Sequence, residues 1–420
     1  MLKPSSSSGG FRLFNSINRI PFTCISWRHS VLTVLRHFTL ILVLCIFRAP
    51  EFCSQNLSTI QFSTNLESTV FRPDSVANTE SRDALPLRYM PGMRQNISIL
   101  GRQENLDINQ VMSLCMDSRH DIWIGGYNGE IARYDGHRIH YYHLAPLFAN
   151  PIEDILEDSQ GNIWFGSRAG GIVRYNGIQF DYFGPQGGCS FKVFSFYEDR
   201  QGIVWACTNG DGLIGIRNNQ YVQLSVSGGL KDPAVTCMTQ TNNGELCTGY
   251  FKRGVVRNSQ SVEGLPDSTV FALSYTSHGL LAATRQGLCF ISDGTDEAKM
   301  IIEGTGFLDL LSLSDGSVMC ASNGNGIFRI ASSDGFDWKV SEHITTDQGL
   351  SSNRITNLVN DREGNIWVGT YDAGLNLIRP QLFQSFNVAT GLISDRHWSL
   401  LRNGNDIYAG YSTEGIASFN

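Results

Sequence analysis

The chain has 420 residues, of which 41% are hydrophobic and 11% aromatic, with 43 glycines but only 12 prolines. This composition is typical of a globular protein with many tight turns. The formal net charge is -7, from 32 Lys and Arg against 39 Asp and Glu, and no basic run offsets it. Because a nucleic-acid binder needs a basic surface, we expect no DNA or RNA partner.

The N-terminal region is dominated by one apolar run, FTLILVLCIF, from Phe38 to Phe47. Arg28 and Arg36 precede the run and a polar sequence follows it, which is the layout of an export signal. Because Arg36 and His37 interrupt the apolar residues before Phe38, a stable membrane span is the weaker interpretation, and a buried core helix is a further alternative. No small-x-small cleavage site follows. The segment is therefore predicted to be a signal peptide or a signal anchor.

The sequence divides into four regions on this basis. We predict a disordered leader at residues 1–30, the signal peptide or signal anchor at 31–50, a polar linker with weak strand signals at 51–95, and a repeat region at 96–420. The bulk of the chain is expected outside the cytoplasm, either periplasmic or secreted, with membrane contact only through the N-terminal segment.

A unit of about 41 residues returns eight times between residues 106 and 420. Four copies are marked by Trp in an element such as Gly-Asn-Ile-Trp, and the other four carry Cys, Leu, Met or Tyr at the same position. We call these eight positions the anchors: Trp123, Trp164, Trp205, Cys247, Leu281, Met319, Trp367 and Tyr408.

Each unit has the same internal order of short strands and turns. In four units an apolar strand ends in Asp six residues before the anchor, and in every unit Gly follows the anchor by six or seven residues, where a tight hairpin needs it. Four short strands in about 41 residues are typical of a propeller blade, whereas a helical repeat would need apolar residues at a spacing of 3.6. The fold class is therefore predicted to be all-β, a β-propeller of four-stranded blades. The anchor aromatics should pack between neighbouring sheets.

The repeat resembles a known family. The pattern D-x-x-G-N-I-W-x-G-T-x-x-x-G-[IL] is clearest at residues 361–375 and 158–172, and R-Y-[DN]-G follows the anchor at residues 133–136 and 174–177. On these residues the chain is similar to the two-component regulator propeller repeat. The WD40 repeat fits less well, because neither Trp-Asp nor the upstream Gly-His recurs.

The resemblance implies a role in sensing. Such propellers are typically the extracytoplasmic input regions of membrane-bound sensor histidine kinases, and they commonly respond to small molecules, carbohydrates in particular. This sequence contains no phospho-acceptor helix and no ATP-binding motif up to Asn420. We therefore expect a signal-transduction protein whose given residues bind a ligand but cannot phosphorylate.

The number of blades follows from where the ring closes. Unit 8 ends after its third strand, and the strand-like sequence between Ala84 and Leu100 could supply its fourth. On that basis we expect eight blades. The alternative, which the family precedent favours, is a ring of seven blades with unit 8 opening a second propeller.

Function in a propeller usually lies in the loops that gather around the central channel. These are the loops between the second and third strands and those between one blade and the next. They hold Arg, Lys, Asn, Asp and Tyr side chains, a mixture that suits a polyhydroxylated or anionic ligand. The candidate ligand-binding residues are Tyr127, Arg168, Asp211, Lys252, Arg253, Arg285, Asn325, Arg354, Tyr371, Asp372 and Arg396.

No catalytic or cofactor motif accompanies these loops. The sequence has no HExxH, no Gly-x-Ser-x-Gly and no phosphate loop, and its ten cysteines show no CxxC and are interpreted as buried apolar residues. We expect no catalytic residue, no metal and no cofactor. Two alternatives stay open: a scaffold that docks a protein partner, and a lyase or hydrolase of the streptogramin-lyase type, which would need a channel-facing His and acid pair.

Overall fold

The computed structural model describes residues 62, 64–71, 80–89, 96–144, 150–169, 171–224, 234–380, 399–403, 406–410 and 415–419. The predicted leader and N-terminal apolar segment lie outside these residues. Within them, no helix is both long and apolar enough to cross a membrane. The only helices named in this part of the chain are two short 3-10 turns, η2 (Arg102–Glu104) and η4 (Thr346–Gln348).

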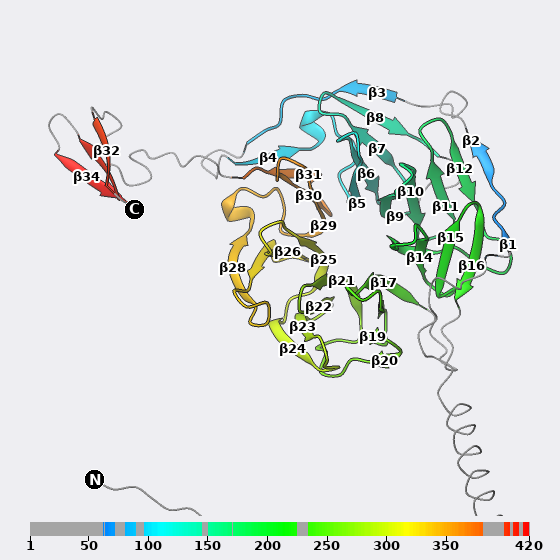
Figure 1. Cartoon of the computed structure of the whole chain (residues 1–420). Helices are drawn as coiled ribbons and strands as arrows, with labels where there is room; N and C mark the ends of the chain where they lie inside the picture. The colour runs from blue at the N-terminus through cyan, green and yellow to red at the C-terminus, as the bar shows by residue number, and fades with distance from the viewer. Residues whose placement is uncertain are drawn as a thin grey trace, which may run out of the picture. The chain divides into compact units, whose positions relative to one another are not determined.

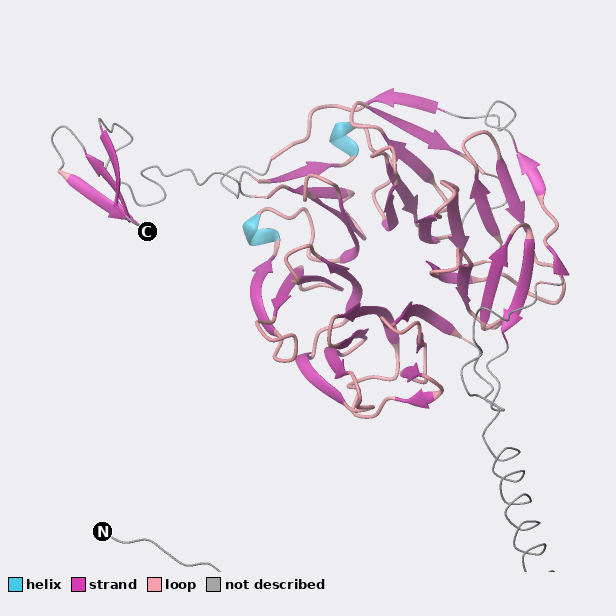
Figure 2. Cartoon of the chain, in the orientation of Figure 1, coloured by secondary structure: helices cyan, strands magenta, loops and turns pink. Residues whose placement is uncertain are grey.

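Seven antiparallel sheets are arranged around a common axis as a β-propeller (Figures 1 and 2). The innermost strands of blades 1 to 7 are β5 (Val111–Met116), β9 (Ile152–Glu157), β13 (Val193–Glu198), β17 (Val235–Gln240), β21 (Val270–Thr276), β25 (Phe307–Ser312) and β29 (Ile355–Asn360). The second strands, which carry the anchors, are β6 (Ile122–Gly126), β10 (Ile163–Ser167), β14 (Val204–Thr208), β18 (Leu246–Tyr250), β22 (Gly279–Thr284), β26 (Val318–Ser322) and β30 (Ile366–Thr370). Each innermost strand contacts the next, and β29 contacts β5, so the ring is complete.

The third and fourth strands form the outer half of each blade. The third strands are β7 (Ile131–Tyr134), β11 (Ile172–Tyr175), β15 (Leu213–Arg217), β19 (Val255–Arg257), β23 (Gly287–Ser292), β27 (Ile327–Ala331) and β31 (Leu375–Ile378). The fourth strands are β8 (Arg138–Tyr142), β12 (Phe180–Phe183), β16 (Gln220–Leu224), β20 (Gln260–Ser261), β24 (Ala298–Glu303), β28 (Lys339–Ile344) and, in blade 7, β4 (Ile97–Leu100).

The fourth strand of blade 7 comes from the N-terminal side of the repeats. β4 pairs antiparallel with β31, so that Leu100 lies opposite Leu375 and Ile97 opposite Ile378. An N-terminal strand therefore closes the ring, but it does so on unit 7 and not on unit 8. The prediction of eight blades is wrong, because the propeller has seven.

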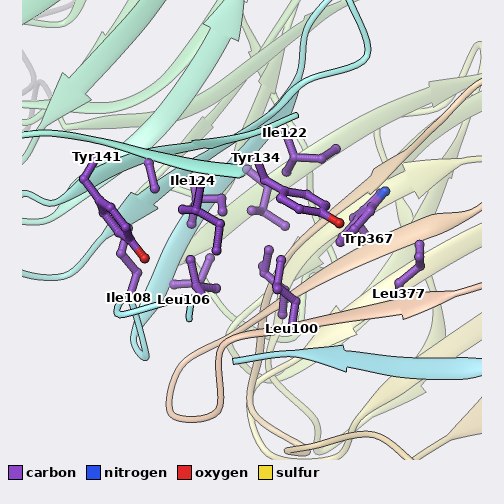
Figure 3. Packing of buried hydrophobic residues seen from close by; sticks show 14 residues of the cluster. Leu100, Leu106, Ile108, Ile122, Ile124, Tyr134, Tyr141, Trp367 and Leu377 are labelled. Atoms are coloured by element: carbon purple, nitrogen blue, oxygen red, sulfur yellow. The ribbon is translucent and has the colours of Figure 1, made fainter. Parts of the chain in front are cut away.

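Burial explains why β4 pairs in this position. All four of its residues are buried. Leu100 packs in a cluster that joins Trp367 and Leu377 of blade 7 to Ile122 and Ile124 of blade 1, as Figure 3 shows. A strand with apolar residues on both faces fits only where both faces are covered. Residues 382–388, which follow the third strand of unit 7 in the sequence, lie outside the described residues.

The segment expected to be a linker contributes further strands. β3 (Glu80–Asp83), β2 (Thr69–Phe71) and β1 (Thr64–Asn65) pair as fifth strands with the outer edges of blades 1, 2 and 3 respectively. We call these three strands the outer strap. Read towards the N-terminus, the chain passes from blade 7 to blades 1, 2 and 3, and it covers edges that would otherwise expose backbone groups.

Unit 8 forms a sheet of its own. β32 (Ser399–Asn403), β33 (Asp406–Gly410) and β34 (Ile416–Phe419) pair only with one another among the described residues. The ring is therefore built by units 1 to 7 together with β4.

The Asp that precedes the anchor stabilises the first hairpin of the blade. In blades 1, 2 and 3 one carboxylate oxygen accepts backbone N–H bonds from the turn, as Asp199 does from Gln201 and Ile203. The other oxygen accepts the indole N–H of the anchor, at 2.9, 2.7 and 2.8 Å in blades 1, 2 and 3. The buried indole N–H would otherwise lack a partner, which costs about 1–3 kcal/mol. The spacing of six residues therefore has a structural cause.

The R-Y-[DN]-G element has a similar local role. Arg133 and Arg174 lie opposite their anchors on the third strand, and their guanidinium carbons are 5.7 and 5.5 Å from the Trp123 and Trp164 rings. Asp135 accepts two backbone N–H bonds of the following turn. These residues build the blade and leave the loops as the variable part.

Candidate functional site

The residue four positions after each anchor has the same backbone bond in all seven blades. Its N–H donates to the carbonyl of the residue just before the innermost strand, at 2.8–3.3 Å. We call these seven the mouth residues: Tyr127, Arg168, Asn209, Phe251, Arg285, Asn323 and Tyr371. Their acceptors are Gln110, Pro151, Lys192, Ala234, Thr269, Gly306 and Arg354. Both sets of loops therefore lie on one face around the axis, as the sequence predicted, and we call it the loop face.

Four of the predicted residues come together where blade 7 meets blade 1. The rings of Tyr127 and Tyr371 lie edge to face with centroids 6.1 Å apart, and Tyr127 is 38% exposed. The guanidinium carbon of Arg354 is 4.1 Å from the centre of the Tyr371 ring, and a terminal nitrogen of Arg354 is 3.8 Å from Asp372. Tyr127, Tyr371, Arg354 and Asp372 together form what we call the tyrosine platform.

A second aromatic pair lies where blade 3 meets blade 4. The rings of Phe194 and Phe251 are stacked, with centroids 6.5 Å apart and planes 5° from parallel, and Phe251 is 41% exposed. The ammonium of Lys252 is 6.0 Å from the centre of the Phe251 ring, and Lys252 forms no ion pair with any described residue. We call Phe194, Phe251 and Lys252 the phenylalanine platform.

Sequence reasoning found Lys252 but missed both phenylalanines. Phe251 stands four residues after Cys247, as Tyr127 and Tyr371 stand after their anchors, so the repeat register alone could have identified it. Phe194 is the second residue of an innermost strand, and nothing in the sequence marks that position as part of the loop face.

Two predicted arginines are held by carboxylates. The Arg168 Nε lies 2.6 Å from Glu153, and an Arg285 terminal nitrogen lies 2.9 Å from Asp267. Burial raises the pKa of Glu153, although Arg168 opposes the shift. Burial also acts to raise the pKa of Asp267, but the Thr269 N–H and Arg285 outweigh it and lower this pKa below its usual value. Half or more of each arginine side chain remains exposed, so both present donors to solvent.

Three other predicted residues make contacts within or between neighbouring loops. The Asp211 carboxylate is buried and accepts the backbone N–H groups of Ser190 and Phe191. The amide of Asn325 donates to Thr305, and its own backbone N–H donates to Ser322. The guanidinium carbon of Arg253 is 5.3 Å from the Tyr250 ring. Arg396 lies outside the described residues.

A belt of carboxylates beneath the loop face ties neighbouring blades together. Asp154 of β9 accepts the Phe196 N–H of the next blade at 2.6 Å, and Asp309 of β25 accepts the Leu358 N–H at 2.8 Å. Burial raises the pKa of Asp154 to about 7, against the effect of its two N–H donors, and the negative charge of Asp309 adds to the rise. Burial raises the pKa of Asp309 as well.

The loop face carries both arginine and lysine side chains, on a chain whose net charge is -7. Arg168, Arg285 and Arg354 lie near acids, but Lys192 and Lys252 have no ion-pair partner within the described part of the chain. No group of three or more His, Cys, Asp or Glu side chains among the described residues is placed to hold a metal ion. The chemistry available here is stacking, hydrogen-bond donation and attraction of anions.

Comparison with known families confirms the sequence resemblance. The family model described as the two component regulator propeller matches residues 105–128, 146–169 and 349–372. These segments contain the anchors of units 1, 2 and 7, so the chain carries repeats of this family. No curated protein matches the chain.

Solved structures share the fold at low identity. The extracellular domain of a protein described as a hybrid two component system from B. thetaiotaomicron is 19% identical with a TM-score of 0.60, over 79% of this chain and 48% of that one. The extracellular domain of a protein described as a one component system from the same organism is 19% identical with a TM-score of 0.54, over 80% of this chain and 46% of that one. This chain therefore spans about half the length of either domain.

A propeller enzyme shares the fold as well. Virginiamycin B lyase from Staphylococcus aureus is 14% identical with a TM-score of 0.52, over 71% of this chain and 99% of the lyase. At these identities each likeness shows the β-propeller and nothing more, and function must be argued from the loop face.

Proposed function

We propose that this chain is the ligand-binding propeller of an extracytoplasmic sensor in two-component signalling. The repeat family and the two extracellular domains support this proposal. The observation that carries it is the contrast between a constant backbone and variable side chains. All seven mouth residues make the same N–H bond, yet their side chains include Arg, Asn, Phe and Tyr.

The side chains of the loop face favour a small polyhydroxylated or anionic ligand. Partly exposed guanidinium groups at Arg168, Arg285 and Arg354 offer planar pairs of donors, which suit carboxylates and vicinal hydroxyls. The aromatic rings of the two platforms offer flat apolar faces. Such combinations of donors and stacking rings are typical of small-molecule sites.

The lyase alternative is less well supported by the loop face. No mouth residue and no acceptor residue of the seven blades is a histidine, and His397 lies outside the described residues. A protein scaffold remains the second candidate, because the two platforms would also receive the side chains of a peptide.

Calorimetry and thermal shift against a panel of neutral and acidic glycans test the proposal. A ligand present at a hundred times its Kd stabilises the folded state by about 2.7 kcal/mol, which a thermal shift detects. The triple variant Arg168→Ala, Arg285→Ala and Arg354→Ala should abolish the shift. The pair Lys299→Ala and Lys339→Ala on the outer edges of blades 5 and 6 serves as a control and should leave it unchanged. An undiminished shift in the triple variant would exclude the three arginines as ligand-binding residues.

A further inference from the structure

We infer that the ligand reaches both platforms at once, and that it is an elongated acidic molecule with a ring at each end. This inference rests on the proposed function and deepens it. It assigns two subsites to the loop face, one at the tyrosine platform and one at the phenylalanine platform.

The order of the blades places the two platforms on opposite sides of the axis. The tyrosine platform belongs to blades 7 and 1, and the phenylalanine platform belongs to blades 3 and 4. Going around the ring, only blade 2 separates them in one direction, and blades 5 and 6 separate them in the other (Figure 1). The direct path between the two platforms therefore passes close to the axis.

The fold does not require aromatic rings at these positions. The backbone bond of the mouth residues is made equally well by Arg168, Asn209, Arg285 and Asn323. Tyr127 and Phe251 nevertheless leave 38% and 41% of their surface exposed. Large rings left exposed at polar-tolerant positions, each packed against a second ring, present rigid flat surfaces on which a sugar or aromatic ring can stack.

Each platform has a cation beside its ring. Arg354 lies over Tyr371 at 4.1 Å, and its nearest acid, Asp372, is 3.8 Å away, beyond hydrogen-bond distance. Lys252 lies 6.0 Å from the Phe251 ring and has no ion pair with a described residue. A ligand that stacks at both ends therefore meets a cation at both ends, Arg354 beside Asp372 and Lys252 without an ion pair to a described residue, and an acidic group near each ring can pair with them.

Length dependence is the direct consequence of two separated subsites. Binding at the second subsite becomes intramolecular once the first is filled, so a molecule long enough to span both gains affinity that a short one cannot. The probes are oligogalacturonates, as a disaccharide and as a hexasaccharide, with neutral maltohexaose for comparison. We expect calorimetry to show the acidic hexasaccharide binding at least about tenfold more tightly than the disaccharide. Raising the salt concentration should weaken this binding.

Variants at the two platforms then test which residues make the subsites. Phe251→Ala and Tyr127→Ala should each weaken hexasaccharide binding about tenfold, and the double variant should bind the hexasaccharide no better than the disaccharide. Phe251→Tyr and Tyr127→Phe keep a ring and should retain most of the affinity. Because these side chains are exposed and their backbone bonds stay, unchanged melting temperatures are expected.

The outcomes separate this inference from the proposed function. Equal binding of short and long acidic probes, an effect of only one of the two alanine variants, or binding of maltohexaose in preference to the acidic probes would overturn the two-subsite inference and leave the sensor proposal standing. Failure of all three probes to bind would overturn the inference, while the proposed function would then be judged on the wider glycan panel.

Discussion

Blades 1 to 3 and blades 4 to 6 reach the same architecture with different local chemistry. In blades 1 to 3 each anchor is a Trp whose indole N–H is bound by the Asp six residues earlier, and the outer strap adds a fifth strand to each sheet. In blades 4 to 6 the anchors are Cys247, Leu281 and Met319, and four strands suffice. All six anchors are buried. The propeller therefore needs an apolar anchor in each blade, while the Trp and Asp pair stabilises particular hairpins.

Blade 7 lies between these two groups. It has the Trp367 anchor and Asp361 six residues before it, but one carboxylate oxygen of Asp361 accepts the side-chain N–H of Asn365 at 2.6 Å. The Trp367 ring packs against Tyr134 of blade 1. Its fourth strand comes from before blade 1. The last blade thus keeps its own hairpin and is joined to the first blade by its anchor and its fourth strand.

The largest expected effect is at the anchors of neighbouring blades 3 and 4. Trp205 is fully buried, so Trp205→Ala should lower the free energy of unfolding by about 3–5 kcal/mol, because it leaves a large cavity and removes the donor to one Asp199 carboxylate oxygen. Cys247→Ala removes only one sulfur atom and should cost roughly 1–2 kcal/mol. Urea denaturation of both variants measures the difference. Equal losses of stability in the two variants would mean that the Trp205 indole stabilises its blade no more than the smaller Cys247 side chain does.

The carboxylate of the same hairpin should have the next largest effect. Asp199→Ala leaves the indole N–H and two backbone N–H groups without their acceptor and should cost about 2–3 kcal/mol. In blade 4 the Thr241 hydroxyl accepts only the Glu245 N–H, at 3.1 Å, so Thr241→Ala should cost about 1 kcal/mol. Thermal unfolding at neutral pH compares the two. A larger loss of stability for Thr241→Ala than for Asp199→Ala would contradict the stronger role assigned to the Asp of the Trp-anchored hairpin.

The outer strap should make a smaller contribution. Leu66 follows β1, is 7% exposed and packs with Phe191 and Tyr221 between blades 2 and 3. Leu66→Ala should cost about 2 kcal/mol, the lower end of the range for buried leucines, because the site lies near the surface. Val70→Ala in β2 is the matched control, since Val70 is 50% exposed and should lose less than about 0.5 kcal/mol. Similar losses for the two would show that the strap acts only through its backbone.

The pH dependence of stability involves the belt below the loop face. Because the folded pKa of Asp154, about 7, lies above the unfolded value near 4, the folded state binds more protons between these values. Stability from this group is therefore complete below about pH 4 and falls as the pH rises towards 7, by at most about 1.4 kcal/mol per pH unit.

Asp154→Asn should flatten this slope, whatever it costs at acidic pH through loss of one acceptor. Denaturation at several pH values between 4 and 8 gives the slope for the wild type and the variant. Asp309→Asn, on the opposite side of the ring, should lower the pKa of Asp154, since the negative charge of Asp309 contributes to the raised pKa of Asp154. An unchanged slope in Asp154→Asn would assign the pH dependence to other groups.

The site was predictable where it follows the repeat. Tyr127, Arg168, Arg285 and Tyr371 occupy one repeated position, so the sequence placed them on the loop face correctly. Asp211 was an exception, because a loop Asp looks the same in sequence whether it faces solvent or accepts the N–H groups of Ser190 and Phe191. Whether any of these residues binds a ligand stays a prediction.

The sequence by itself determined the blade, because the hairpins, the anchor and the Asp that binds the anchor lie within one unit of about 41 residues. Only the tertiary structure decided how many blades there are. A short, mostly apolar strand such as Ile97–Leu100 can pair with any open sheet edge, and ring closure between blades 7 and 1 selects the edge that buries both of its faces. The phenylalanine platform also depends on tertiary structure, since Phe194 and Phe251 belong to different units and meet only because neighbouring blades pack side by side.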